Sequence, residues 1–236
     1  MKKLIGATLC LFLAFSAFAG EKFENIVGAG LTLPVSVTKY NSSSDSRGFD
    51  GKSFTQVGLG ADLFWVGVMK DMGLAFKADF AIDGFLKSEY DDLEMDIAPE
   101  KPKLSSLFDK KTFGEISFDV GAGYAFIRND KFTLAAFGVI GVTATANEYE
   151  ATHDGNTAKM NFKSASFDFG ADIFANYKIV KGFGVFADLA FKGMAGSTTV
   201  SVEIPEVTPG VSFENSTTTS TIGFKFAPTI GASFAF

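Results

Sequence analysis

The chain has 236 residues, of which 47% are hydrophobic, and it carries a formal net charge of -6 with one histidine and one cysteine. Its acidic balance and its lack of clustered Lys and Arg argue against nucleic acid as a partner, because binding to phosphates needs clustered cations. The length fits one domain of moderate size.

The first 19 residues have the pattern of a cleaved export signal. Lys2 and Lys3 precede an apolar run, and Ala17-Phe18-Ala19 supplies the small-residue pattern that a signal peptidase cleaves. The run is shorter than the roughly 18 residues that a membrane-spanning helix needs. We therefore expect residues 1–19 to be removed and residues 20–236 to form the mature domain.

Apolar side chains recur at every second position in eight segments, a pattern typical of β-strands with one large apolar face. The segments lie at about 23–37, 56–65, 74–83, 115–126, 132–145, 166–177, 183–192 and 221–236. In the fifth segment both faces are apolar, and we take Leu134, Ala136, Ile140 and Val142 as its large face.

Short and long connections alternate along the chain. The short ones are "MKDMG", "RND" and "KIVKG", whereas the long polar ones lie at 38–53, 86–111, 146–163 and 197–219. In the last of these we expect the strands to continue into a hairpin with its turn within 205–210. Short turns at one end and long loops at the other predict an all-β fold, an eight-stranded antiparallel up-and-down transmembrane β-barrel with both termini on the short-turn side.

A soluble barrel or a two-layer sandwich would also have alternating strands. The volume of the large side chains distinguishes these folds from a membrane barrel. An eight-stranded barrel has just enough room to be filled by side chains, and its interior has no room for some forty large apolar residues. The small and acidic face fits inside. The large face must therefore point outward, against lipid.

The sequence resembles the small outer-membrane barrels of the OmpA, OmpX and OmpW type. The resemblance rests on the strand number, on the mature length and on the apolar C-terminal segment that ends in Phe234 and Phe236. In such barrels the C-terminal Phe is the signal for the insertion machinery. The Phe-rich lipid face also resembles spirochaete outer-membrane barrels. The resemblance implies outer-membrane lipid as the environment, periplasmic termini, extracellular long loops and a monomer.

The inward face is expected to be charged and acidic. We expect Lys77 to pair with Asp62 or Glu115, and Lys225 with Asp188, and any conduction to be small and cation-selective. The predicted lumen residues are Asp62, Lys77, Asp79, Asp83, Glu115, Asp119, Asp168, Asp172, Asp188, Lys192 and Lys225.

Two prolines lie in the first and last strands, which meet where the barrel closes. Pro34 and Pro228 each lack the N–H that a strand ladder needs. They indicate either a bulge or local opening at this seam, or a pair of tolerated kinks. An opening would favour a lateral route for small apolar molecules into the membrane, as proposed for OmpW-like barrels.

The sequence offers little support for catalysis, for a metal or for a cofactor. His153 lies near Glu148, Glu150 and Asp154 in a stretch that we interpret as a solvated loop tip. The acidic group Asp91, Asp92, Glu94 and Asp96 lacks the spacing and the glycine of a calcium loop. We therefore expect no enzyme.

Two functions follow from this interpretation. The first is a structural or surface-interaction role, with a possible extracellular ligand at the long loops. The second is a narrow cation-preferring channel or a carrier for small hydrophobic solutes.

Overall fold

The computed structural model describes residues 23–41, 51–93, 103–153, 156–180, 182–208 and 211–236. The expected signal segment lies outside them. Within these ranges the strands are β1 Phe23–Thr32, β2 Val35–Asn41, β3 Ser53–Met69, β4 Leu74–Ser88, β5 Lys110–Arg128, β6 Phe132–His153, β7 Asn156–Val180, β8 Phe183–Thr208 and β9 Val211–Ala235.

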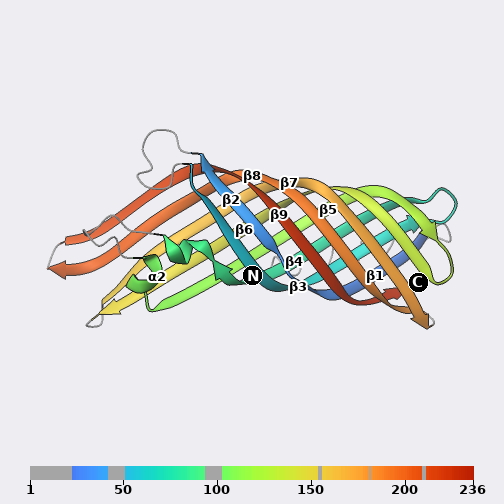
Figure 1. Cartoon of the computed structure of the whole chain (residues 1–236), viewed down its shortest axis with the longest axis horizontal. Coiled ribbons are helices and arrows are strands. Elements are labelled where there is room, and N and C mark those ends of the chain that lie inside the picture. Colours follow the sequence, from blue (N-terminus) through green and yellow to red (C-terminus); the bar gives the residue numbers. More distant parts are fainter. Residues whose placement is uncertain (1–22, 42–50, 94–102, 154–155, 181, 209–210) are drawn as a thin grey trace.

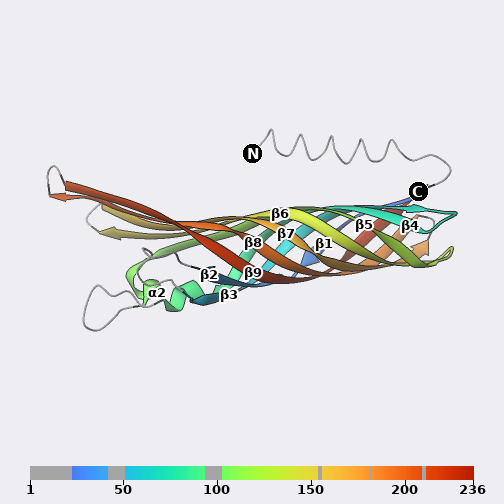
Figure 2. The same ribbon diagram turned by 90° about the horizontal axis from the view of Figure 1, so that it is seen from above.

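The strands form a closed antiparallel barrel, which Figures 1 and 2 show from two sides. Each strand from β3 to β8 pairs with the next one in the chain, and β9 closes the ring by pairing with β1 and β2. β1 and β2 together take one place in the ring, so the predicted eight-stranded barrel is confirmed.

The seam between the first and last strands keeps one register through both prolines. Thr32 lies opposite Thr229, and Val35 lies opposite Phe226. Two residues separate these pairs on each strand, so neither strand has an extra residue. The Leu33 amide donates to the Pro228 carbonyl oxygen at 3.0 Å. Of the two predicted alternatives, the described seam therefore shows two tolerated prolines and no bulge or opening. Only Pro228 lacks a donor toward the seam, because Pro34 faces β3, where its carbonyl oxygen accepts from the Gly58 amide at 2.8 Å.

The large apolar faces point out of the barrel, as predicted. Leu31, Ile140, Phe169 and Ile230 have exposed fractions of 62%, 54%, 53% and 67%. This belt ends toward the long connections where outward positions become charged, at Lys39, Lys87, Glu148 and Lys163. A belt of this kind is stable only in lipid, so the strands span a membrane.

The connections differ between the two ends of the barrel. Between β4 and β5 the 3-10 helix η1 Glu89–Asp92 and the helix α2 Leu104–Leu107 lie at the long-loop end. No helix in the described ranges has the length and apolar character needed to cross a membrane. At the other end the turns are short, and the last residue, Phe236, lies there (Figure 1).

Two of the long connections are strands rather than loops. Residues 146–163 were expected to be a polar loop, but β6 and β7 pair from Phe132 with Tyr177 as far as His153 with Asn156. The last connection forms the predicted hairpin, since β8 continues to Thr208 and β9 begins at Val211. Strands β6 to β9 therefore extend beyond the other strands, as Figure 1 shows at its left side.

The barrel interior has an apolar layer at each end. The turn-end cluster lies toward the short turns and contains Ile26, Phe64, Val66, Val68, Ala75, Ala125, Ala135, Phe137, Val139, Phe174 and Phe186. The loop-end cluster lies toward the long connections and contains Tyr40, Phe54, Tyr90, Leu93, Leu104, Tyr149, Met160 and Phe162. Polar residues fill the space between these two layers.

Candidate functional site

A charged layer fills the middle of the barrel. Its side chains come from inward positions of six strands, and each residue is at least nine-tenths buried. All eleven predicted lumen residues are buried, and they contribute eight carboxyl groups and three amines.

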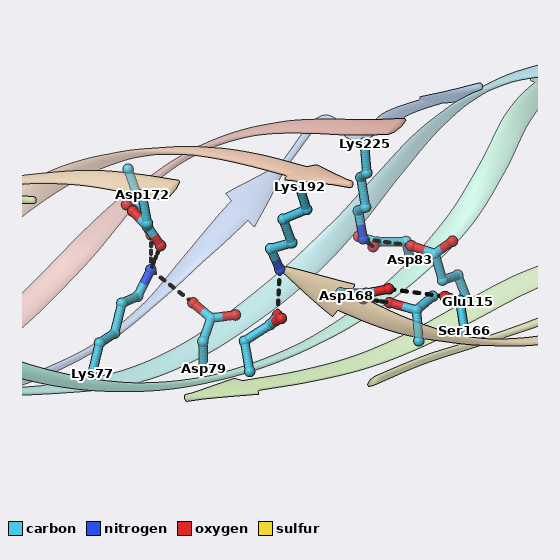
Figure 3. A network of polar contacts seen from close by, with 12 residues as sticks. Lys77, Asp79, Asp83, Glu115, Ser166, Asp168, Asp172, Lys192 and Lys225 are labelled. Carbon is cyan, nitrogen blue, oxygen red and sulfur yellow. Dashed lines mark hydrogen bonds and ion pairs between the residues drawn. The ribbon is translucent and has the colours of Figure 1, made fainter. Parts of the chain in front are cut away.

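Lys77 on β4 is the most connected cation among the described lumen residues. Its Nζ lies 3.1 Å from Asp79 Oδ2, and it also contacts the carboxylates of Asp172 on β7 and Asp188 on β8. Figure 3 shows the amine between Asp172 and Asp79, which stands on the same strand as Lys77. One amine thus has three carboxylate partners.

The other two lysines make separate groups. Lys192 contacts Asp119, while Lys225 contacts Glu115 and lies 3.3 Å from Asp83 Oδ2. These partners differ from the expected ones: Lys77 forms no ion pair with Asp62 or Glu115 in the described structure, and Lys225 none with Asp188. The lysines reach across the interior instead of to the adjacent strand.

Asp168 has hydroxyl partners in place of an amine. It accepts hydrogen bonds from Thr143 Oγ1 and, at 2.9 Å, from Ser166 Oγ. More hydroxyl and amide side chains from Ser36, Thr38, Gln56 and Thr145 line a small cavity of about 20 Å³ beneath the loop-end cluster. A cavity of this size holds about one water molecule.

The loop-end cluster closes the lumen on the side of the long connections. Tyr90 of η1 stacks on Phe54 with ring centroids 4.4 Å apart, and its hydroxyl lies 2.6 Å from that of Tyr40. Burial raises the pKa of Tyr90, and the neighbouring Tyr40 adds to the rise. The sequence interpretation missed this cluster because its aromatic residues are scattered through connections that looked polar.

The acidic residues in the connection between β4 and β5 form hydrogen bonds and ion pairs with their neighbours. Asp91 accepts hydrogen bonds from Lys111 Nζ at 2.8 Å and from Tyr149 Oη at 3.0 Å. The hydrogen bond and charge of Lys103, 2.8 Å away, lower the pKa of Asp92. Glu94 and Asp96 lie outside the described residues. In the described ranges, no group of His, Cys, Asp or Glu is arranged to hold a metal ion.

His153 was singled out in the sequence together with Glu148, Glu150 and Asp154. His153 is the last residue of β6, opposite Asn156, and Asp154 lies outside the described residues. Glu150 Oε1 lies 2.5 Å from Lys159 Nζ, and this lysine lowers the pKa of Glu150 through the hydrogen bond. Glu148 is 3.7 Å from the same lysine. These carboxylates therefore join β6 to β7.

Within the described residues, strand β9 has an open edge beyond the barrel. On one side it pairs with β8 along its whole length, from Phe234 to Val211. On the other side its pairing with β2 ends where Asn41 meets Ser220. In the part of the chain that the structure describes, no strand pairs with residues 211–219 on this side. Such an edge presents unpaired backbone donors and acceptors.

The lipid face carries a hollow next to the seam. It has a volume of about 590 Å³ and lies over β1, β8 and β9. Gly30 and Gly231 lie opposite each other and have no side chains there, while Leu31 and Ile230 stand beside them. Phe186 also lines the hollow.

The comparisons with known proteins concern the fold. No family model matches the sequence, and no curated protein matches it. A major outer membrane protein from Thermus thermophilus is similar with a TM-score of 0.59, 12% identity, and coverage of 88% of this chain and 99% of that one. OprG from Pseudomonas aeruginosa is similar with a TM-score of 0.49 and 11% identity, and the match covers 90% of this chain and 95% of OprG. For Ail, the attachment invasion locus protein of Yersinia pestis, the TM-score is 0.42 and the identity 11%, and the match covers 90% of this chain and 99% of Ail. The chain therefore has the fold of small outer-membrane β-barrels.

Proposed function

We propose that the protein is a closed outer-membrane barrel that presents its long-loop end to partners outside the cell. The observation that carries this proposal is the contrast between a filled lumen and an extended sheet. Two apolar clusters and a charged layer fill the interior, whereas β6 to β9 continue beyond the barrel with an open edge at β9. Filled barrels of eight strands leave no aqueous channel.

The orientation in this proposal follows from the general design of such barrels. Short turns with both termini face the periplasm, and the long connections face outward. Phe234 and Phe236 would be read by the insertion machinery, and the chain would act as a monomer. A partner with an extended segment could add a strand to β9, since backbone hydrogen bonds supply affinity in this mode of binding.

Strand alternation gives a specific test of the open edge. The carbonyl of Pro228 faces β1, so the backbone groups of even-numbered residues of β9 face the seam side. Thr218→Pro therefore removes a donor from the open edge and none from the β8 ladder. Thr218→Val is the matched control, because it keeps the N–H and loses the hydroxyl contact with Thr199, which measures 2.9 Å.

The experiment compares bacterial cells that produce equal surface amounts of the three chains. We expect cells with the wild-type chain and with Thr218→Val to adhere equally to a panel of immobilised extracellular proteins, and cells with Thr218→Pro to adhere several-fold less. Equal adhesion of all three, at the level of cells without the protein, would contradict the surface role of this edge.

Planar bilayers test the closed lumen. We expect no conductance steps from the refolded wild-type barrel in a bilayer where an added porin conducts. Reproducible cation-selective steps would overturn the proposal and favour the channel.

The hollow at the seam supports one alternative, a carrier for small hydrophobic solutes. Its position on the lipid face next to Phe186 would suit a lateral route. Ala29→Phe would fill the hollow from its outward side and should then abolish uptake of such a solute. Unchanged uptake in this variant would exclude the route.

A further inference from the structure

The carboxyl groups around Lys77 exceed the positive charge available to them. Asp79, Asp172 and Asp188 all contact Lys77, and Asp62 lines the same cavity. Asp62 forms no ion pair with a lysine in the described structure. All four carboxyl groups are at least nine-tenths buried. Burying a carboxylate without a counter-charge is strongly unfavourable.

The remaining cations of the lumen already have partners. Lys192 contacts Asp119, and Lys225 contacts Glu115 and Asp83. The charged groups that face this layer come from β3, β4, β5, β7, β8 and β9, and they are Asp62, Lys77, Asp79, Asp119, Asp172, Asp188, Lys192 and Lys225. Neither of the other two lysines can therefore neutralise the surplus around Lys77.

Water cannot hydrate the surplus charge either. The cavity in this layer measures about 20 Å³, which is room for about one water molecule. One oxygen of Asp62, of Asp172 and of Asp188 is buried without a hydrogen-bond partner among the described residues. The apolar clusters above and below separate the layer from bulk solvent.

The carboxyl groups are arranged in two pairs. Asp62 lies within hydrogen-bond reach of Asp79, and Asp188 within reach of Asp172. Ionised carboxylates only accept hydrogen bonds, so a bond between two of them requires a proton on one. Two carboxyl groups that share a site commonly hold one proton between them.

We propose that this layer is a proton-binding site, in which one proton is shared by Asp62 and Asp79 and a second by Asp172 and Asp188 at neutral pH. The two protons leave two negative charges next to Lys77 in place of four. The ligand is the proton rather than a metal, since the described carboxylates are not arranged around a common metal position.

This assignment gives the barrel a definite dependence on pH. In the unfolded chain the four aspartates are ionised at neutral pH, so the folded state binds two more protons. Stability must then fall as the pH rises, and the folding equilibrium constant changes about 100-fold per pH unit for two protons. For carboxylates in ordinary ion pairs the dependence is the opposite, because stability then rises with pH.

The test is equilibrium unfolding in urea, in lipid vesicles, between about pH 6 and pH 8. We expect the wild-type folding constant to fall by about 100-fold per pH unit. The double variant Asp62→Asn, Asp188→Asn replaces each shared proton with an amide donor, so its slope should vanish. Asp168→Asn is the matched control: it is equally buried but bonds only to hydroxyls, so it should keep the wild-type slope.

Infrared spectroscopy of the wild-type barrel tests the proposal without any variant. At neutral pH we expect the carbonyl band of protonated carboxyl groups, with a shift in D₂O. Absence of this band would overturn the proposal. So would a wild-type stability that is independent of pH but rises with added sodium or calcium, because a bound cation would then neutralise the layer.

Discussion

Leu33 and Pro228 lie opposite each other at the seam of the barrel, and the Leu33 amide donates to the Pro228 carbonyl oxygen at 3.0 Å. In an antiparallel pair of this kind the two residues exchange two hydrogen bonds. Proline has no N–H, so the return bond to the Leu33 carbonyl is missing. The seam is thus closed in register but one donor short at this pair.

Pro228→Val should stabilise the barrel by about 1 kcal/mol or more. An unpaired carbonyl in lipid costs several kcal/mol, which exceeds the 0.4–1 kcal/mol or so that a proline contributes by restricting the unfolded chain. Urea unfolding in lipid vesicles measures the change. Ala187→Val, which adds only outward methyl groups, is the control. A loss of stability in Pro228→Val alone would show that the seam does not accept the restored donor.

Gly60→Ala should destabilise the barrel by about 1–3 kcal/mol, because the interior has no room for the added methyl group. A Cβ at this position would lie 1.9 Å from Asp83 Oδ1 and 2.5 Å from the Ile82 carbonyl oxygen. Gly84→Ala is the control, since its nearest neighbours would be 3.9 Å away. Equal unfolding midpoints of the two variants would contradict the close packing around Asp83.

Lys77→Met should cost about 3–5 kcal/mol, because it leaves buried carboxylates without their counter-charge. Adding Asp172→Asn and Asp188→Asn to this variant should restore much of the stability, since both changes remove surplus negative charge. Unfolding midpoints of the single and triple variants measure the effect. If the triple variant were less stable than Lys77→Met, the three residues would not act as one electrostatic group.

The loop-end cluster should weaken at alkaline pH. Burial and the nearby carboxylate of Asp91 raise the pKa of Tyr149. At a pH where the phenol of Tyr149 is ionised in the unfolded chain, it is therefore still neutral in the folded cluster. The contribution is complete below about pH 10 and is lost as the pH rises beyond it. The near-ultraviolet circular dichroism signal of the cluster should disappear as the pH rises. In Tyr149→Phe this transition should be less steep, because one proton fewer is released. An identical pH profile in both chains would contradict the assignment.

Phe236→Ala should lower the amount of barrel in the outer membrane of cells several-fold, yet leave refolding in detergent unchanged. The side chain is 53% exposed, so its removal leaves no cavity in the fold. Heat-modifiable migration on gels measures both quantities. Ile230→Ala is the control, because Ile230 lies on β9 and is also exposed, at 67%. A similar loss for both variants in cells would contradict a specific signal in the last residue.

The strands and their faces could be predicted because alternation is a local property of the chain. Even the uncertain segment 132–145 was assigned correctly, since Ile140 and Val142 are exposed while Phe137 and Val139 are buried. The lysine partners could not be predicted in the same way. Lys77 reaches Asp172 and Asp188 across the lumen, and such contacts depend on the stagger and width of the closed ring.

The loop-end cluster was missed for a different reason. Apart from Phe54, its members come from three of the long connections, and in each of these a few apolar residues stand among many polar ones. Tyr90, Leu93 and Leu104 lie within a stretch that was interpreted as a solvated acidic loop. The available signal was that large apolar residues occur in connections that should not need them.

Strand β9 pairs with neighbours on both of its edges, and Gly28 lies opposite Ser233 at the seam. Bringing residues about 200 positions apart together costs about 5 kcal/mol in chain entropy if the chain between them is flexible, and the seam bonds form only when β9 is in place. During synthesis the ring therefore stays open until its final residues have emerged. Every shorter chain is an open sheet with two free edges, which are sites for aggregation. Closure of the barrel is therefore a single late step, and the free edges must be protected until it takes place.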